Sequence, residues 1–387
     1  MKKIFTLVLV AIFAFALLGC QAQNNSQTNN SNTTNNNTSN GSGKTDKNLK
    51  IVIVTSPSSV DDGSFNQDNY NGIKNFIKDH PGATVQTLTE TNVNNAINTV
   101  ESVVADYDVI VTPGFQFTGI YSIAQANPTK DFILVDSFPT DKDSKEVEAS
   151  NIYAMQFAEQ ESGFYAGVAA AMQTKTGKVA VVNGIGYPSN VNYQFGFESG
   201  VNYANKHLNT SATMVALPSY AGKDVNGNIV GGNYIGNFND PATGKVVGNA
   251  LLDKGVDIIF VAAGASGNGV FTAVKERGNA YVIGCDVDQY SDGANGSSNI
   301  VLTSALKVMA PNVTKQLEAI NDGTFTGGNY TLTAVTDSTG IVTTPGSMQL
   351  SDSTVTELDT VYQLVKNGTI VPASNFNGSK PDNFKGL

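Results

Sequence analysis

The 387-residue chain contains no Trp, only two His and two Cys, and a single arginine, Arg277. So few His and Cys side chains exclude the usual zinc sites and disulfide frameworks. The net charge is −10, and because phosphate binding needs clustered Lys and Arg, the composition also excludes a nucleic-acid partner. Only 14% of residues are charged and 40% are hydrophobic, so the chain can bury sizeable cores beneath a mostly neutral polar surface.

The first twenty residues, MKKIFTLVLVAIFAFALLGC, have a basic start, an apolar stretch and the ending Leu-Leu-Gly-Cys. This plan is typical of a secretory signal, and the ending resembles a bacterial lipobox, in which Cys20 is lipidated. The alternative is a transmembrane anchor, which needs about 20 apolar residues, and the stretch Ile4–Leu18 is shorter. We therefore predict a signal peptide over residues 1–19 and a lipid anchor on Cys20 at the extracytoplasmic face of the cell membrane.

Residues 21–48 are rich in Asn, Ser and Thr and contain one apolar side chain, Ala22. Such a segment cannot bury enough apolar surface to fold on its own. With the lipidated cysteine it forms a predicted tether over residues 20–48, which leaves residues 49–387 for the folded domain. The alternative is a tail without function, and the composition does not separate the two.

From Lys50 onward, short apolar runs alternate with helical patterns. The alternation predicts parallel sheets covered by helices on both faces. The number of predicted strands, about ten, is too large for a single open sheet of ordinary size, so the predicted fold is α/β with two doubly wound lobes. Ser64 and Gln67 have the spacing of a capping box at the first helix. The predicted strands are Lys50–Thr55, Thr84–Leu88, Val109–Thr112, Phe132–Asp136, Ile152–Phe157, Val179–Asn183, Thr213–Leu217, Ile258–Ala262, Tyr281–Gly284 and Val301–Ala305.

Polar and aromatic side chains follow the ends of several predicted strands. They occur in VDDGSFN after the first strand, at Asp136 after the fourth, and in the later stretches YIGNFND, AAGASGNG, GCDVDQ and VLTSALK. Ligands of doubly wound sheets bind beyond the carboxyl ends of the strands. Aromatic faces together with amides, acids and a lysine suit a neutral, polyhydroxylated ligand.

The ordered set formed by the lipobox, DDGSFNQ, FAEQESGFYAG, TKTGKVAVVNG, NFNDPATGK, AAGASGNGV, IGCDVDQ and VLTSALK resembles the basic membrane protein family. Members of that family are lipoprotein substrate-binding proteins of ABC importers, usually with nucleosides as ligands. The resemblance covers the chain from about Lys50 to its end. It implies a type I periplasmic-binding-protein fold whose two lobes, joined by a multi-strand hinge, close on the ligand.

The resemblance also implies a monomeric receptor that has no catalytic residues, metal or cofactor and that delivers its ligand to an ABC permease. With this fold we expect the first lobe at about residues 49–155 and 287–335, and the second at about 156–286 and 336–387.

Several positions match the ligand-binding residues of that family. The resemblance implies that Phe65 stacks on the base beside Asn66, that Phe238 supplies the opposite face with Tyr193 as the alternative, and that Gly264 lets the ligand approach the backbone. It implies ribose contacts from Asp136, Asp286 and Lys307. The alternative roles are strand-end turn residues for the two aspartates and a solvated surface charge for the lysine.

One position departs from the family pattern. The family usually reads Thr-Asp-x-Gly-Gly after the first strand, with the Asp reading the base edge, whereas this chain reads Thr55-Ser56-Pro57-Ser58-Ser59. Ser56 can still form a hydrogen bond to a base, but not as a charge-assisted acceptor. For the neighbouring Asp61 and Asp62 we expect a structural role, stabilising the positive end of the following helix.

Three other functions are alternatives to this one. A nucleoside hydrolase would also place aspartates in a strand-end loop, around a calcium ion, but calcium needs about six to eight oxygen ligands and the loop offers only one adjacent pair of acids. The same receptor fold binding a sugar or another non-nucleoside solute is the nearest alternative. A surface adhesin is the third, and it has no exposed apolar stretch in its favour.

Overall fold

The computed structural model describes residues 46–55 and 57–387, so the predicted signal peptide and Cys20 lie outside the described residues. Strand β1 (Lys50–Thr55) shows how the fold begins, because its buried residues alternate between two cores. Ile51 and Ile53 pack on the side of helices α1 and α8, whereas Val52 and Val54 pack on the side of α2 and α3. An apolar strand buried on both faces is typical of a parallel sheet between helical layers.

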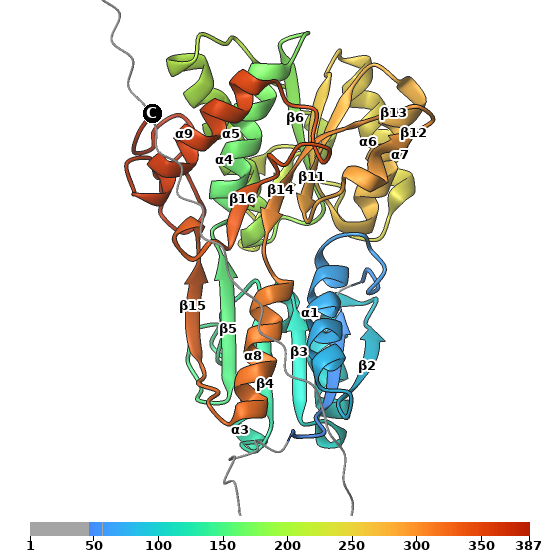
Figure 1. The fold of residues 1–387 in the computed structure, drawn as a ribbon, viewed down its shortest axis with the longest axis vertical. Coiled ribbons are helices and arrows are strands. Elements are labelled where there is room, and N and C mark those ends of the chain that lie inside the picture. Colours follow the sequence, from blue (N-terminus) through green and yellow to red (C-terminus); the bar gives the residue numbers. More distant parts are fainter. Residues whose placement is uncertain (1–45, 56) are drawn as a thin grey trace, which may run out of the picture. The chain divides into compact units, whose positions relative to one another are not determined.

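The first sheet has the strand order β15-β5-β4-β3-β1-β2, and all of its pairs are parallel. One face is covered by α1 (Phe65–Asp79) and α8 (Ala310–Asp322), and the other by α2 (Ala96–Val103), α3 (Tyr121–Ala126) and the 3-10 helix η3 (Phe115–Ile120). We call this unit the first lobe (Figure 1). Its strands besides β1 are β2 (Thr84–Thr89), β3 (Val109–Pro113), β4 (Asp131–Val135), β5 (Ile152–Phe157) and β15 (Gly328–Leu332).

The second sheet has the order β16-β14-β11-β10-β6-β7, and only its edge strand β16 is antiparallel. Its strands are β6 (Lys178–Asn183), β7 (Thr213–Met214), β10 (Ile258–Ala262), β11 (Tyr281–Asp286), β14 (Val301–Lys307) and β16 (Thr339–Ile341). Two short hairpins, β8–β9 (Gly222–Lys223, Ile229–Gly231) and β12–β13 (Ala294–Asn295, Ser298–Asn299), extend from this second lobe.

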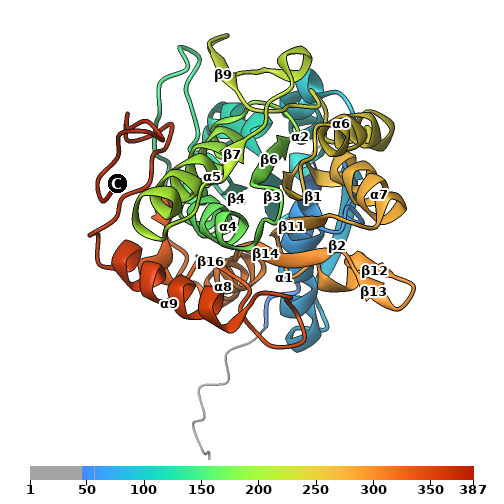
Figure 2. The ribbon, with the colours of Figure 1, turned by 90° about the horizontal axis from the view of Figure 1, so that it is seen from above.

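Helices cover both faces of the second sheet. Helices α4 (Glu159–Gln173), α5 (Pro188–His207) and α9 (Asp352–Lys366) pack on one face, and α6 (Pro241–Asp253) and α7 (Gly267–Arg277) pack on the other (Figure 2). The structure has two lobes, and the strands of each lobe's main sheet are parallel except for β16, which confirms the predicted fold class. None of the described helices is both long and apolar enough to cross a bilayer.

Within residues 57–387, the chain passes between the sheets after β5, after β14 and after β15. These connections differ from the predicted lobe boundaries, because Val301–Lys307 was expected in the first lobe. Pairing of β14 with β11 and β16 places this segment in the second sheet, and the chain returns to the first lobe only with α8. The predicted strand Thr213–Leu217 was also too long, since β7 ends at Met214.

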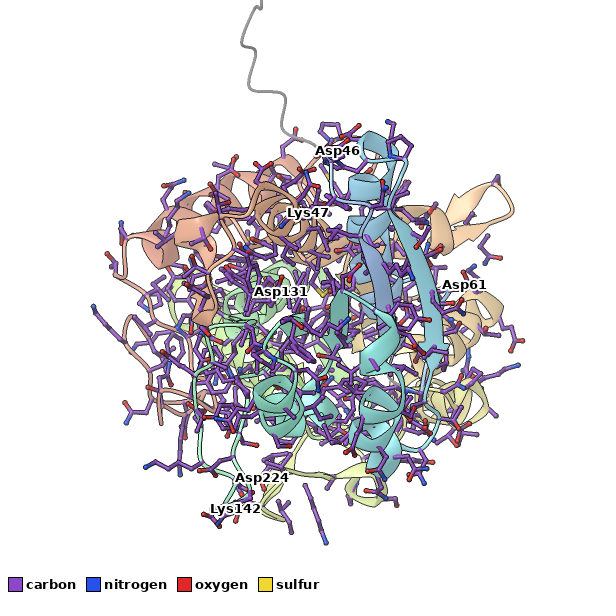
Figure 3. All side chains as sticks on the ribbon, turned by 90° about the horizontal axis from the view of Figure 1, so that it is seen from below. Asp46, Lys47, Asp61, Asp131, Lys142 and Asp224 are labelled. Carbon is purple, nitrogen blue, oxygen red and sulfur yellow. The ribbon has the colours of Figure 1, made fainter. Side chains whose placement is uncertain are left out.

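The described chain begins against the first lobe. Lys47 donates its backbone N–H to Asn321 Oδ1 at 2.9 Å and its ammonium to the carbonyl of Ile320 at 2.8 Å. His80, at the end of α1, contacts Asp46 at 3.1 Å and Glu318 of α8 at 2.9 Å. Figure 3 shows Asp46 and Lys47 at this end of the molecule. The junction therefore joins the start of the folded domain to two helices.

Candidate functional site

A cavity lies where the carboxyl ends of the strands of the two sheets meet. It is lined by Phe65, Asp136, Tyr193, Phe238, Gly264, Asp286 and Lys307, all of which were predicted as ligand-binding residues, and also by Ser58, Asp62, Gly114, Phe115, Gln116, Tyr187, Ser189, Asn190, Ala262 and Cys285. Strand ends that are far apart in the sequence thus contribute to one site, as expected for doubly wound sheets.

The loop before α1 is organised by Asp62. Its buried carboxylate accepts the backbone N–H groups of Ser64 and Asn66 at 3.0 Å and that of Gln67 at 3.1 Å. This bears out the structural role expected for Asp62, whereas Asp61 is exposed. The predicted capping box is wrong: Ser64 makes no side-chain cap, because its hydroxyl is directed at Asp286 of the other lobe.

Asp286, at the end of β11, accepts hydrogen bonds from both lobes. Tyr193 donates to its Oδ1 at 3.0 Å, and Ser64 donates to its Oδ2 at 2.7 Å. Its backbone has a φ of +70°, and Asp136, directly after β4 in the first lobe, has a φ of +75°. Aspartate tolerates this left-handed conformation better than most residues do, and such uncommon backbone conformations cluster at functional sites.

Lys307, the last residue of β14, is buried, and its Nζ lies 2.5 Å from Asp136 Oδ1. Burial alone would lower the pKa of this ammonium, but the carboxylates of Asp136, Glu159 and Asp286 together raise it above its usual value. The ammonium also lies 5.2 Å from the ring centroid of Phe65 and 5.3 Å from that of Tyr193, within reach of cation–π attraction. The predicted alternative of a solvated surface charge is therefore wrong for Lys307.

Aromatic side chains from both lobes surround the cavity. The ring of Phe238 occupies the space beside Gly184, where an added Cβ would come within 2.2 Å of it. Tyr187 lies 5.9 Å from Phe238 and 5.2 Å from Phe115 of the first lobe, measured between ring centroids. The cavity therefore presents flat apolar faces next to its charged end.

Hydrogen bonds also join the lobes at the rim. Ser58 donates from Oγ to the carbonyl of Phe238 at 2.9 Å, and Gln289 donates from Nε2 to the carbonyl of Gly63 at 3.2 Å. Gly264 has a φ of +54°, and a Cβ at this position would lie 3.3 Å from Ser58 Oγ. With the Lys307–Asp136 pair, these contacts describe a closed arrangement of the two lobes.

One of the predicted ligand-binding positions that the structure describes does not line the cavity. Asn66 is buried at the start of α1, where its side chain donates to the carbonyl of Ser58 at 2.8 Å. Ser56 lies outside the described residues. Conversely, sequence reasoning missed Phe115, Gln116 and Tyr187, although the rule that identified Asp136 was sufficient. Phe115 and Gln116 follow the third predicted strand and Tyr187 follows the sixth, so all three lie beyond the carboxyl end of a strand, as Asp136 does.

The chemistry of the cavity suits recognition of a small molecule. Carboxylates and a lysine can exchange hydrogen bonds with ligand hydroxyls, and the aromatic faces can enclose a flat ring. Across residues 46–55 and 57–387, no group of three or more His, Cys, Asp and Glu side chains is arranged to hold a metal ion. Burial raises the pKa of the Cys285 thiol well above its usual value, so this cysteine has little thiolate character.

Comparisons with known proteins agree with this architecture. Residues 49–216 and 220–375 match the family model described as "ABC transporter substrate-binding protein PnrA-like". The chain is 30% identical over 347 residues to the "ABC transporter nucleoside-binding protein BmpA" of Lactococcus lactis subsp. cremoris, with 84% of this chain and 87% of that protein covered. It is 28% identical to "Basic membrane protein A" of Borreliella burgdorferi, covering 87% of this chain and 91% of that protein.

A solved ABC transporter solute-binding protein from Aeropyrum pernix K1 superposes with a TM-score of 0.71 at 21% identity, covering 85% of this chain and 94% of that chain. This likeness supports the fold. Because the family model spans most of the folded domain, the chain belongs to the Bmp family of PnrA-like ABC transporter substrate-binding proteins, which are extracytoplasmic receptors that deliver a small-molecule ligand to a permease and are not enzymes.

Proposed function

We propose that this receptor binds a nucleoside between its two lobes, either a purine nucleoside or a related ribose-bearing ligand. The observation that carries the proposal is the placement of Asp136, Asp286 and Lys307 at one end of a cavity that also presents Phe65 and Phe238. The charged end suits the hydroxyls of a ribose, and the aromatic faces suit a base. The name of the Lactococcus lactis relative, a nucleoside-binding protein, supports the same ligand class.

The anchor is a second part of the proposal. Residues 1–19 act as a signal peptide, Cys20 carries the lipid, and residues 20–48 hold a monomeric receptor near its permease in the membrane. Cys20→Ser should abolish lipid modification and leave the protein shed or unprocessed. A Cys20→Ser protein that still partitions into detergent like the wild type would overturn the anchor assignment.

Calorimetric competition with inosine, guanosine, adenosine, uridine and ribose tests the ligand class. Phe65→Ala should weaken nucleoside binding by about 0.5–1.5 kcal/mol beyond the loss of buried area. Asp286→Ala should weaken it by about 1–3 kcal/mol, because ligand hydroxyls would stay unpaired in a closed site. If a free sugar or an unrelated solute binds and no nucleoside does, the ligand is a non-nucleoside solute and only the receptor role stands.

Position 56 sets the expected base preference. A carboxylate there would accept hydrogen bonds from the ring N–H and amino groups of inosine and guanosine, whereas a serine hydroxyl both donates and accepts and so discriminates less. Ser56→Asp should therefore shift preference towards inosine and guanosine over uridine, by on the order of 1 kcal/mol. An unchanged ranking of the five ligands would remove Ser56 from the base-reading site.

A further inference from the structure

Glu159 is a buried acid that neither the sequence reasoning nor the cavity lining includes. It is the first residue of α4, directly after the chain leaves the first sheet, and it is 1% exposed. Its Oε1 lies 3.1 Å from Lys307 Nζ without accepting a hydrogen bond, and its Oε2 accepts one from Asn192 Nδ2 at 3.2 Å. Glu159 therefore contacts Lys307 at the charged end of the cavity without itself lining the cavity.

The residues next to Glu159 form hydrogen bonds beside the connections between the lobes. The carboxylate of Glu161 accepts a hydrogen bond from Ala334 N at 2.7 Å and one from Thr339 Oγ1 at 2.5 Å. Ser162 donates from Oγ to the carbonyl of Leu306 at 2.7 Å and accepts from Gly340 N at 3.1 Å. The first turn of α4 thus contacts the end of β14, the connection after β15 at Ala334 and the start of β16, and it directly follows the connection after β5. We call this turn, residues 159–162, the hinge node.

We propose that Glu159 is a positioning residue that holds the Lys307–Asp136 pair at the cavity and couples it to the hinge node. The inference rests on the proposed function, because it assigns Lys307 and Asp136 to ligand binding. In this arrangement, a ligand that engages the pair acts on the same turn through which the lobes are connected.

The charges in the cluster indicate how Glu159 acts. Complete burial raises its pKa to about 8, the Asp136 carboxylate adds to the rise, and the Lys307 ammonium opposes it. This raised pKa favours the protonated, neutral form of Glu159 near neutral pH, which leaves the carboxylates of Asp136 and Asp286 and the ammonium of Lys307 to meet the ligand. The other titratable group facing it is Tyr193, whose pKa burial raises well above the usual value, so Tyr193 stays protonated over the same range.

The test measures adenosine binding by calorimetry at pH 6.5 and pH 9, because adenosine carries no group that titrates in this interval. Glu159→Gln keeps a neutral side chain of the same shape and should bind within about twofold of the wild type at pH 6.5. Glu159→Leu should bind about tenfold more weakly. The wild type should lose affinity at pH 9, as Glu159 ionises and competes with Asp136 for Lys307, whereas Glu159→Gln should not.

Glu198→Gln is the matched control. Glu198 is a half-buried acid whose pKa burial also raises, to about 7, but it lies on α5 and accepts a hydrogen bond from Gln194. This variant should bind adenosine like the wild type at both values of pH. The inference is overturned if Glu159→Leu binds with wild-type affinity, or if Glu159→Gln retains the wild-type loss of affinity at pH 9.

A ligand-free measurement separates this inference from the proposed function. A folded-state pKa raised above the usual 4.5 gives stability at low pH that is lost as the pH rises to about 8. The melting temperature of the wild type relative to Glu159→Gln should therefore fall across that window. If it does fall but adenosine does not bind, the proposed ligand is wrong while the buried cluster stands; if it does not fall, the neutral state of Glu159 is wrong whatever binds.

Discussion

At the scale of single residues, the adjacent acids Asp61 and Asp62 have different surroundings. Asp62 is buried and holds three backbone N–H groups at the start of α1, whereas Asp61 is exposed. Asp62→Ala should lower the free energy of unfolding by about 0.5–2 kcal/mol, as for loss of a helix cap. Asp61→Ala should change it by less than about 0.5 kcal/mol. Urea denaturation measures both, and equal losses for the two variants would contradict the assignment.

Single residues also show where prediction from sequence stops. Asp136, Asp286 and Lys307 could be proposed because each follows a strand, and strand ends of parallel sheets meet at one edge. The orientation of the Ser64 hydroxyl could not be predicted. The capping-box spacing to Gln67 is a local signal, whereas its actual partner, Asp286, lies 222 residues away in the sequence. Glu159 was missed for a related reason: a glutamate at a helix start has an ordinary local explanation, and only tertiary packing brings it to Lys307.

At the scale of helices, α4 and α5 pack through glycines. A Cβ at Gly167 would lie 2.1 Å from the carbonyl oxygen of Phe197, and one at Gly200 would lie 2.1 Å from that of Phe164. Alanine normally stabilises a helix by about 1 kcal/mol relative to glycine. Here Gly167→Ala should instead destabilise the protein, because the backbones must separate and overpacking costs about 1–3 kcal/mol.

Gly340→Ala is the control for this prediction, because a Cβ at Gly340 meets nothing within 4 Å. Thermal unfolding of the two variants decides the question. A melting temperature for Gly167→Ala at or above that of the wild type would show that the two helices can move apart without loss.

The junction at the end of α1 gives a pH-dependent prediction. Partial burial would lower the pKa of His80, but its contacts with Glu318 and Asp46 raise it above the usual value. Because the folded-state pKa is raised, the contribution of His80 to stability is fully present below its usual pKa of about 6.5 and is lost as the pH rises through the folded-state value. The advantage of the wild type over His80→Gln in melting temperature should therefore shrink from acid to alkaline pH.

Proton NMR can follow the same group directly, because the chain has only two histidines. His80→Gln leaves the His207 signal alone and so assigns both resonances. Glu318→Gln should lower the titration midpoint of His80, and an unchanged midpoint would exclude the contact with Glu318 in solution.

Secondary structure elements were predictable where their own pattern was strong. The apolar run KIVIVT was sufficient to predict β1. The edge strands β15 and β16 were not predicted, since GNYTL and TGI have no buried apolar run and become strands only by pairing with β5 and β14. The error in the lobe boundaries has the same origin. The sequence of β14 predicts a strand but not the sheet to which it belongs, and only its pairing with β11 and β16 assigns it to the second sheet.

At the scale of the whole molecule, the contacts between Ser58 and Phe238, Ser64 and Asp286, and Lys307 and Asp136 require the lobes to be close. Ligand binding should shift the population towards this closed form, because a ligand touching both lobes binds it better. Small-angle scattering should show a smaller radius of gyration with saturating nucleoside than without it. Identical profiles at saturation would contradict closure around the ligand.

The position of the hinge node separates the hydrogen bonds that must break before a ligand can leave from those that can stay intact. The hydrogen bonds of Glu161 and Ser162 join the start of α4 to β14, to β16 and to the connection after β15, so they can persist while the lobes separate. The contacts that join the two lobes at the cavity and its rim must instead break together. The residence time of the ligand then depends on the contacts between the lobes at the cavity and its rim. Substitutions at these contacts should alter the dissociation rate more than the association rate, as in most interfaces. A receptor that must release its ligand to a permease can thus be tuned for slow or fast release at the cavity rim, with its pivot left unchanged.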